Sequence, residues 1–90
     1  RHTRHLEFRL QLRAIDAALP KDVYATARRY YIDTVTTHSV AVKRVRFSGK
    51  SRDVALTYEE RDGVVWLITI HPLKRRQLES RVHSGRWRKV

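Results

Sequence analysis

The most apolar segment of the chain is residues 64–72, in which Val, Leu, Ile and Trp fill most positions. Asp62-Gly63 precedes it and Pro72 closes it, as is typical of a β-strand bounded by turn residues. Both alternating faces are largely apolar, so we expect part of the second face to be covered as well. The polar exceptions, Thr69 and His71, lie at its C-terminal end. The pattern predicts a central strand whose chemistry lies at that end.

A period of two also runs through residues 38–47 and 52–60, which predicts two further antiparallel strands. A three-residue loop ending at Gly63 keeps the apolar residues of the second hairpin on one face, whereas a two-residue Asp62-Gly63 turn mixes the faces. A two-residue Gly49-Lys50 turn serves the first hairpin in the same way. The predicted cross-strand pairs are Tyr58 with Trp66, Leu56 with Ile68, Val54 with Ile70, Val45 with Val54, Arg46 with Asp53, and Asp53 with His71.

Helical spacing of apolar residues predicts a first helix over residues 3–14 and a second from Pro20 to about Tyr31. Residues 32–37 lack that spacing and are expected to form a loop or a short edge strand. Beyond Pro72, leucine and valine among Lys and Arg predict a short basic helix, followed by a tail. The fold class is therefore α+β: two N-terminal helices packed on a three- to four-stranded antiparallel meander, with a short basic C-terminal helix and tail. Residues 1–90 are expected to form a single domain.

Charge and composition narrow the range of partners. Twenty Lys and Arg against nine Asp and Glu give a formal net charge of +11. Such a field attracts polyanions, so RNA or DNA is the first partner to consider, and an acidic protein or a membrane surface is the alternative. The chain has no cysteine and no apolar run long enough to span a membrane. We therefore expect a cytoplasmic protein without disulfides, with no membrane partner and no cofactor.

The predicted register places Arg46, Asp53 and His71 in one row on the face away from the two helices. A carboxylate beside a histidine favours the imidazolium and orients the ring, and an arginine can hold a phosphate. These groups suit cleavage of RNA without a metal: one takes the proton of the ribose 2′-hydroxyl, a cation stabilises the phosphorane and an acid protonates the leaving oxygen. The alternative is a structural ion pair with a histidine beside it.

Two further groups of basic residues are candidates for contact with RNA. His5, Arg9 and Arg13 follow each other at a spacing of four on the first helix, where they either contact phosphates and the active site or form a solvated face. His2 and His5 lack partner ligands at metal-binding spacing, so no metal site is expected. The second group joins arginine to tryptophan, a combination suited to phosphate contact and base stacking, unless Trp87 simply docks the tail on the sheet edge. The candidate nucleic-acid-binding residues are Arg13, Arg44, Lys74, Arg81, Arg86 and Trp87.

The order of elements resembles that of the RelE-like toxins, in the barnase/EndoU/colicin/RelE group of small RNases. A closer likeness is to small bacterial domains that begin with a His-x-x-x-Arg-x-x-x-Arg helix and end their sheet on a strand similar to Leu-Ile-Thr-Ile-His-Pro. The residues that carry this resemblance are His5, Arg9, Arg13, residues 67–72, Gln77, Arg81 and Gly85-Arg86-Trp87.

The resemblance implies a toxin-type mRNA endonuclease, acting freely or on the ribosome, with an acidic antitoxin-like partner. By position, His5, Arg9 and His71 match its motifs. With the row above, the predicted catalytic set is His71, His5, Arg9, Arg46 and Asp53, and the expected products end in 2′,3′-cyclic phosphates. The alternative is a non-catalytic RNA-binding or regulatory module of a toxin–antitoxin or defence system.

Overall fold

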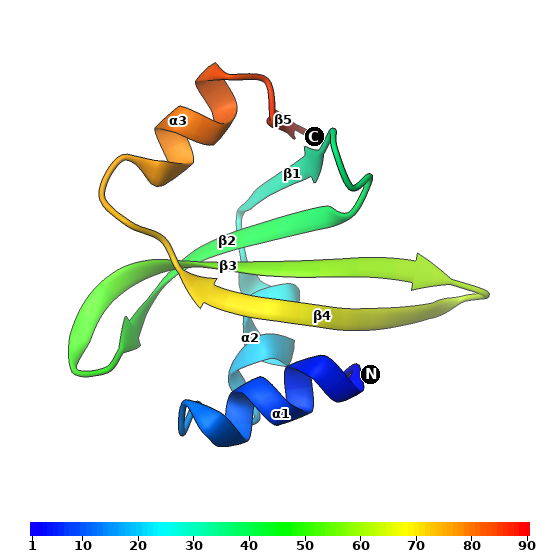
Figure 1. The fold of residues 1–90 in the computed structure, drawn as a ribbon, viewed down its shortest axis with the longest axis vertical. Helices are drawn as coiled ribbons and strands as arrows, with labels where there is room; N and C mark the ends of the chain where they lie inside the picture. Colours follow the sequence, from blue (N-terminus) through cyan, green and yellow to red (C-terminus); the bar gives the residue numbers. More distant parts are fainter.

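The structure is a computed structural model that describes all 90 residues. Three helices and five strands form an α+β fold, which is the predicted class, with one strand more than the three to four expected (Figure 1). In chain order they are α1 (Arg4–Leu12), α2 (Leu19–Thr26), β1 (Arg29–Asp33), β2 (Ser39–Phe47), β3 (Lys50–Arg61), β4 (Val64–Pro72), α3 (Gln77–His83) and β5 (Trp87–Lys89).

All strands join one antiparallel sheet in the order β4-β3-β2-β1-β5. The segment 64–72 is a strand, but it lies at one edge of the sheet and not at its centre. In Figure 1, α1 and α2 lie on one side of the strands and α3 lies at the opposite end of the molecule. No helix is both long and apolar enough to cross a membrane.

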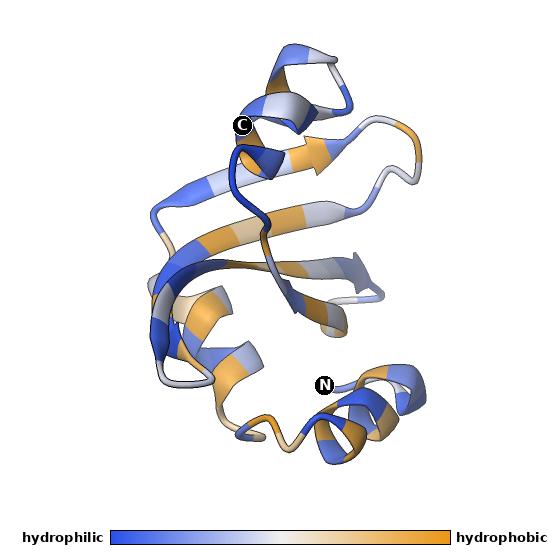
Figure 2. Ribbon diagram, turned by 60° about the vertical axis from the view of Figure 1, so that its left-hand side comes forward, coloured by the Kyte–Doolittle hydropathy of each residue, from blue (hydrophilic) through white to orange (hydrophobic).

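The sheet carries an apolar core on each face. Along β3, Val54 and Leu56 belong to the first core, whereas Ala55 between them belongs to the second. The first core includes Leu6 and Leu10 of α1 and Val23 of α2, so both N-terminal helices cover one face, as expected; the second is covered by α3, Leu73 and Trp87. In Figure 2 the strands carry apolar segments, in orange, in their middle parts. Hydrophilic segments, in blue, lie towards several strand ends, where the sequence has arginines.

The helices begin where the sequence provides a suitable first turn. Thr3 caps α1 by accepting a hydrogen bond from the Leu6 amide at 3.2 Å, and Pro20 lies in the first turn of α2. The second helix is shorter than predicted, because the chain becomes extended at Ala27 and Tyr31 lies within β1. β-Propensity and pairing with β2 outweigh the helical spacing there.

The predicted three-residue loop between β3 and β4 is wrong. Arg61 pairs with Val64 across a two-residue turn in which Asp62 and Gly63 both have positive φ. A β-bulge then shifts the register: Tyr58 pairs with Leu67 and Thr57 with Thr69, so Ile68 has no partner. The bulge restores Ile70 to the helix-covered face, opposite Leu56, whereas Leu67 takes the place predicted for Trp66.

The predicted turn between β2 and β3 is also displaced. Phe47 pairs with Lys50 across Ser48-Gly49, so Val45 lies opposite Arg52 and not Val54. Both hairpins therefore differ from the predicted register by two positions near the site. A shift of two preserves the face of every side chain and changes its partner.

The tail forms a fifth strand that the sequence did not predict as such. Trp87 pairs with Asp33 and Lys89 with Tyr31, so the tail docks on the free edge of β1, which was the alternative considered for Trp87. At the other edge, the first three residues lie beside β4: the Leu67 amide donates to the carbonyl of Arg1 at 2.7 Å and the Thr3 amide to that of Leu67 at 3.0 Å.

Candidate functional site

His71 lies near the end of β4, in a cleft between this edge of the sheet and the C-terminal part of α1. It pairs with Ala55 of β3. Arg9 of α1 and Arg13, the residue that follows the last residue of this helix, line the same cleft, which measures about 230 Å³. The structure thus places part of the basic helix stripe beside the end-of-strand histidine, which was one of the two alternatives for this stripe. We call this cavity the His71 cleft; its walls are Arg9, Arg13, Ile15, Phe47, Ser48, Ile70, His71 and Pro72.

The surroundings of His71 favour its neutral form. Burial lowers the pKa of its imidazole below the usual 6.5, and the positive charges of Arg9 and Arg81 lower it further. Arg9 approaches from α1 on one side of the sheet, while Arg81 belongs to α3 on the other. No carboxylate forms an ion pair with His71. The ring is therefore a neutral proton acceptor at pH 7, flanked by two fixed cations.

The predicted row of Arg46, Asp53 and His71 is wrong in its geometry. Asp53 lies opposite Arg44, and Arg46 lies opposite Ser51. Asp53 shares a face with His71 but is displaced from it by two positions along β3. Its carboxylate accepts two hydrogen bonds from Arg29, from Nη2 at 2.9 Å and from Nη1 at 3.3 Å. Asp53 thus holds β1 to β3 and does not orient the histidine.

Three other predicted residues lie outside the His71 cleft. Arg46 lines a neighbouring cavity together with Arg13. His5 is exposed on α1 and lines none of the cavities, although it stands one turn before Arg9. Arg44 is 64% exposed in its side chain and reaches within 3.9 Å of Asp53 Oδ1. Arg29 was missed as the partner of Asp53 because its segment was assigned to a helix.

A second, open cavity of about 600 Å³ runs along α3 and the loop before it, on the side of the sheet opposite α1. Lys74, Arg81 and Arg86 of the predicted set all line it, and Arg75 and Arg76 join them. No carboxylate and no apolar side chain line this cavity. We call it the basic groove; its lining residues are Lys74, Arg75, Arg76, Gln77, Ser80, Arg81, Ser84 and Arg86.

The basic groove is tied to the sheet by a network around the buried carboxylate of Asp33. Arg86 Nε donates to Asp33 Oδ1 at 3.0 Å, and Trp87 Nε1 donates to Oδ2 at 3.3 Å. The amides of Val35 and Thr36 also donate to Oδ1. Burial alone raises the pKa of Asp33, but the hydrogen bonds from Arg86 and these amides outweigh it and lower the pKa to about 2.

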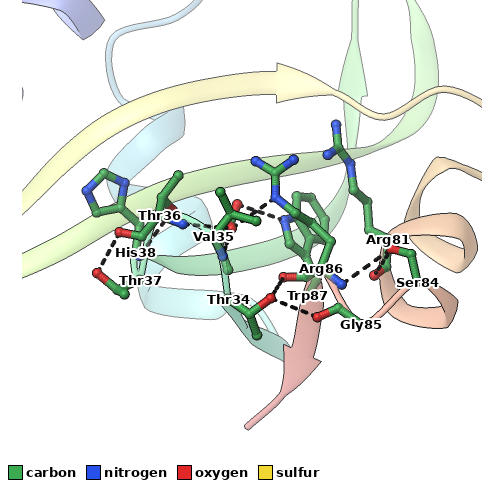
Figure 3. Close-up of polar contacts among 11 residues, drawn as sticks. Thr34, Val35, Thr36, Thr37, His38, Arg81, Ser84, Gly85, Arg86 and Trp87 are labelled. Atoms are coloured by element: carbon green, nitrogen blue, oxygen red, sulfur yellow. Dashed lines mark hydrogen bonds and ion pairs between the residues drawn. The ribbon is translucent and has the colours of Figure 1, made fainter.

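Figure 3 shows the same junction from the side of the loop. Thr34 bonds to the carbonyls of Gly85 and Arg86, and Ser84 contacts both Arg81 and Arg86. Trp87 is only 4% exposed, stacks on Tyr31 and carries the Arg81 guanidinium at 5.7 Å from its ring centroid. The predicted stacking of a base on Trp87 is therefore wrong, because its indole is packed within the second core.

Positive charge elsewhere on the molecule is largely unneutralised. Of the twenty Lys and Arg, only Arg29, Lys43, Arg44, Arg61 and Arg86 form ion pairs. Lys43 points to the helix side and donates to Asp22 Oδ2 at 3.0 Å. The cations of the His71 cleft and most of those of the basic groove therefore remain available to an anionic ligand. No family model, curated protein or solved structure matches the chain.

Proposed function

We propose that this protein is an endoribonuclease that cleaves RNA at His71. The observation that carries the proposal is that Arg9 and Arg13 line one cleft with a half-buried histidine, whose pKa is lowered by burial and by the charges of Arg9 and Arg81. A neutral imidazole can accept a proton, and arginines can bind a phosphodiester. Cleavage of an internal RNA bond by attack of the 2′-hydroxyl on the adjacent phosphorus requires both properties at one place.

In the proposed reaction, the imidazole of His71 takes the proton of a ribose 2′-hydroxyl. The 2′-oxygen then bonds to the adjacent phosphorus as the bond from phosphorus to the 5′-oxygen breaks, which leaves a 2′,3′-cyclic phosphate. Arg9 and Arg81 stabilise the charge on the phosphorane oxygens. The cleft contains no second side chain that titrates near neutral pH, so the leaving 5′-oxygen takes its proton from water.

The basic groove supplies binding for the rest of the strand. Arg81 both influences the charge of His71 and lines the groove, so an RNA backbone that enters the His71 cleft can continue along Lys74 to Arg86. Since Trp87 is buried, the groove offers cations and hydroxyls but no stacking surface. Contacts there read the phosphate backbone and not the bases.

The decisive experiment incubates the protein with end-labelled single-stranded RNA of mixed sequence, with and without ribosomes and with and without EDTA. We expect fragments that end in 2′,3′-cyclic phosphate, and a loss of at least about a hundredfold in rate for His71→Gln, the usual contribution of a general base. The control is His83→Gln, because His83 is exposed on α3 and lines no cavity. Melting curves for both variants establish that they remain folded.

A non-catalytic RNA-binding module is the second candidate. It is favoured by one specific observation: no carboxylate orients His71, whereas the basic groove is complete without it. If folded His71→Gln binds RNA like the parent and no condition yields cyclic phosphate ends, while Arg75→Gln with Arg76→Gln abolishes binding, the endoribonuclease proposal is wrong and the binding module stands. Growth arrest on expression, relieved by co-expression of an acidic partner, supports the toxin-type form of the proposal.

A further inference from the structure

A third cavity opens beside the His71 cleft, between the connection from α1 to α2 and the turn from β2 to β3. Its volume is about 440 Å³, and half of its lining residues are apolar, among them Ile15, Leu19 and Phe47. Arg13 and Arg46 line it together with two carboxylates, Asp16 and Asp22. We call it the connector pocket. The RNA cleavage proposed for His71 does not involve this pocket.

The connector pocket adjoins the His71 cleft. Arg13, Ile15, Phe47 and Ser48 line both cavities, so Phe47 and Ile15 form a shared wall and Arg13 stands at the junction. A nucleotide whose phosphate lies beside His71 and Arg9 can therefore place its own base, or that of its neighbour, towards the connector pocket. An apolar wall with an aromatic side chain and a few polar groups is the usual surrounding of an unstacked base in RNA recognition.

The polar groups of the pocket select among bases. Asp16 Oδ1 accepts a hydrogen bond from the Ala18 amide at 2.9 Å, and its Oδ2 has no partner within the chain. Asp22 uses Oδ2 to hold Lys43 at 3.0 Å, and 51% of its side chain is exposed. An ionised carboxylate only accepts hydrogen bonds. Guanine offers two adjacent donors, N1–H and the N2 amino group, whereas uracil presents a single N–H between two carbonyl oxygens that repel a carboxylate.

We propose that the connector pocket binds the base of the nucleotide next to the scissile phosphate and prefers guanine over uracil, with Phe47 and Ile15 against the base and Asp16 at its Watson–Crick edge. This inference rests on the proposed function for the placement of the phosphate and adds a base preference to it. It assigns Arg13 the position between the base and the phosphate.

The test is a titration of the ¹⁵N-labelled protein with guanosine 3′-monophosphate and, separately, with uridine 3′-monophosphate, followed by NMR. We expect guanosine to shift the amides of Ala18, Leu19 and Ser48 and to bind about tenfold more tightly than uridine, the size of one hydrogen bond to a charged group. Asp16→Asn can keep its bond to the Ala18 amide, but its amide group confronts guanine N1–H with a donor. This variant should lose most of the preference.

Glu60→Gln is the matched control, because it removes the same charge from an exposed residue that lines no cavity, and it should retain the preference. Equal affinity for the two nucleotides, shifts confined to the basic groove, or an unchanged preference in Asp16→Asn would overturn the inference. The two proposals fail separately. If the protein prefers guanine but cleaves no RNA, the base-binding pocket is supported and the endoribonuclease proposal is wrong. If RNA is cleaved at His71 but no base is preferred, the endoribonuclease proposal is supported and the base-binding pocket is wrong.

Discussion

At the scale of single residues, the chemistry proposed here depends on the surroundings of His71 more than on its identity. The other histidines lie at the surface or beside carboxylates, such as His38, whose Nε2 is 3.4 Å from Glu59 Oε2. His71 instead has two arginines for neighbours, so its charged form is disfavoured by both burial and repulsion. That combination produces a neutral base without a carboxylate partner.

The pH dependence of cleavage tests this account. Because the pKa of His71 is lowered from 6.5, kcat/KM should rise with pH as the ring loses its proton. The rise should have its inflection below pH 6.5 and level off at higher pH. Arg9→Gln removes one repelling charge, so it should move the inflection upward while it lowers the rate. Arg4→Gln, the same change on an exposed residue of the same helix, should leave the inflection in place. An inflection above pH 6.5 in the parent protein would contradict the assignment of His71 as the base.

At the scale of elements, the alternation of apolar residues was sufficient to predict three consecutive strands and the face on which α1 and α2 pack. It could not predict the register. The apolar pattern requires Leu56 to face an isoleucine. The predicted three-residue turn would meet that requirement, but the chain meets it with a bulge at Ile68. Both solutions bury nearly the same side chains, so their pattern cannot distinguish them.

The candidate site divides in the same way. Arg9, Arg13 and His71 were found because a helical stripe and a strand end each have a local pattern in the sequence. Lys74, Arg81 and Arg86 were found because basic residues are dense after Pro72. The ion pair of Asp53 was not predicted, because its partner Arg29 lies in β1, a segment whose apolar residues follow helical spacing and which was therefore assigned to the second helix. The Asp33 network was missed for a related reason: its donors come from a tail that is far from β1 in the sequence.

Asp33 is the residue that joins the tail to the rest of the sheet, and its removal should be costly. Asp33→Ala leaves the Trp87 indole and two backbone amides without their acceptor, so we expect the free energy of unfolding to fall by about 3 kcal/mol. Urea denaturation measures this change. Glu60→Ala, at an exposed position of β3, should alter it by no more than about 0.5 kcal/mol.

The stabilisation that Asp33 provides depends on pH. The pKa of Asp33 is about 2 in the folded protein against an ordinary 3.8, so its contribution to folding stability is complete above pH 3.8 and is lost as the pH falls through about 2. Asp33→Ala should lack this part of the acid dependence. If the variant and the parent lose stability in parallel between pH 4 and pH 2, other carboxylates account for the acid sensitivity.

At the scale of the whole molecule, unpaired cations dominate the surface and should govern RNA affinity. If six or more phosphates are contacted, binding should weaken by roughly a thousandfold between 50 and 200 mM salt, because each neutralised phosphate releases counterions. Fluorescence anisotropy with a labelled single strand gives the slope. The slope of log affinity against log salt concentration should become less steep by about two in the double variant Arg75→Gln with Arg76→Gln, because two phosphate contacts are lost. Arg28→Gln, away from the groove, should change the slope less. A flat response would contradict binding through the phosphate backbone.

The order of strands also bears on how the chain reaches this shape. Strands β1 to β4 are joined as successive hairpins, each formed between segments close in the sequence, whereas β5 must close a loop from residue 87 back to residue 33. Long loops close late because the chain entropy is lost before the contacts form. We therefore expect the meander to form first and the tail to dock afterwards. Arg86 would then arrive with the tail. Arg9 lies at least as far along the chain from His71 as Asp33 lies from Trp87, so in such an intermediate neither the His71 cleft nor the basic groove is complete.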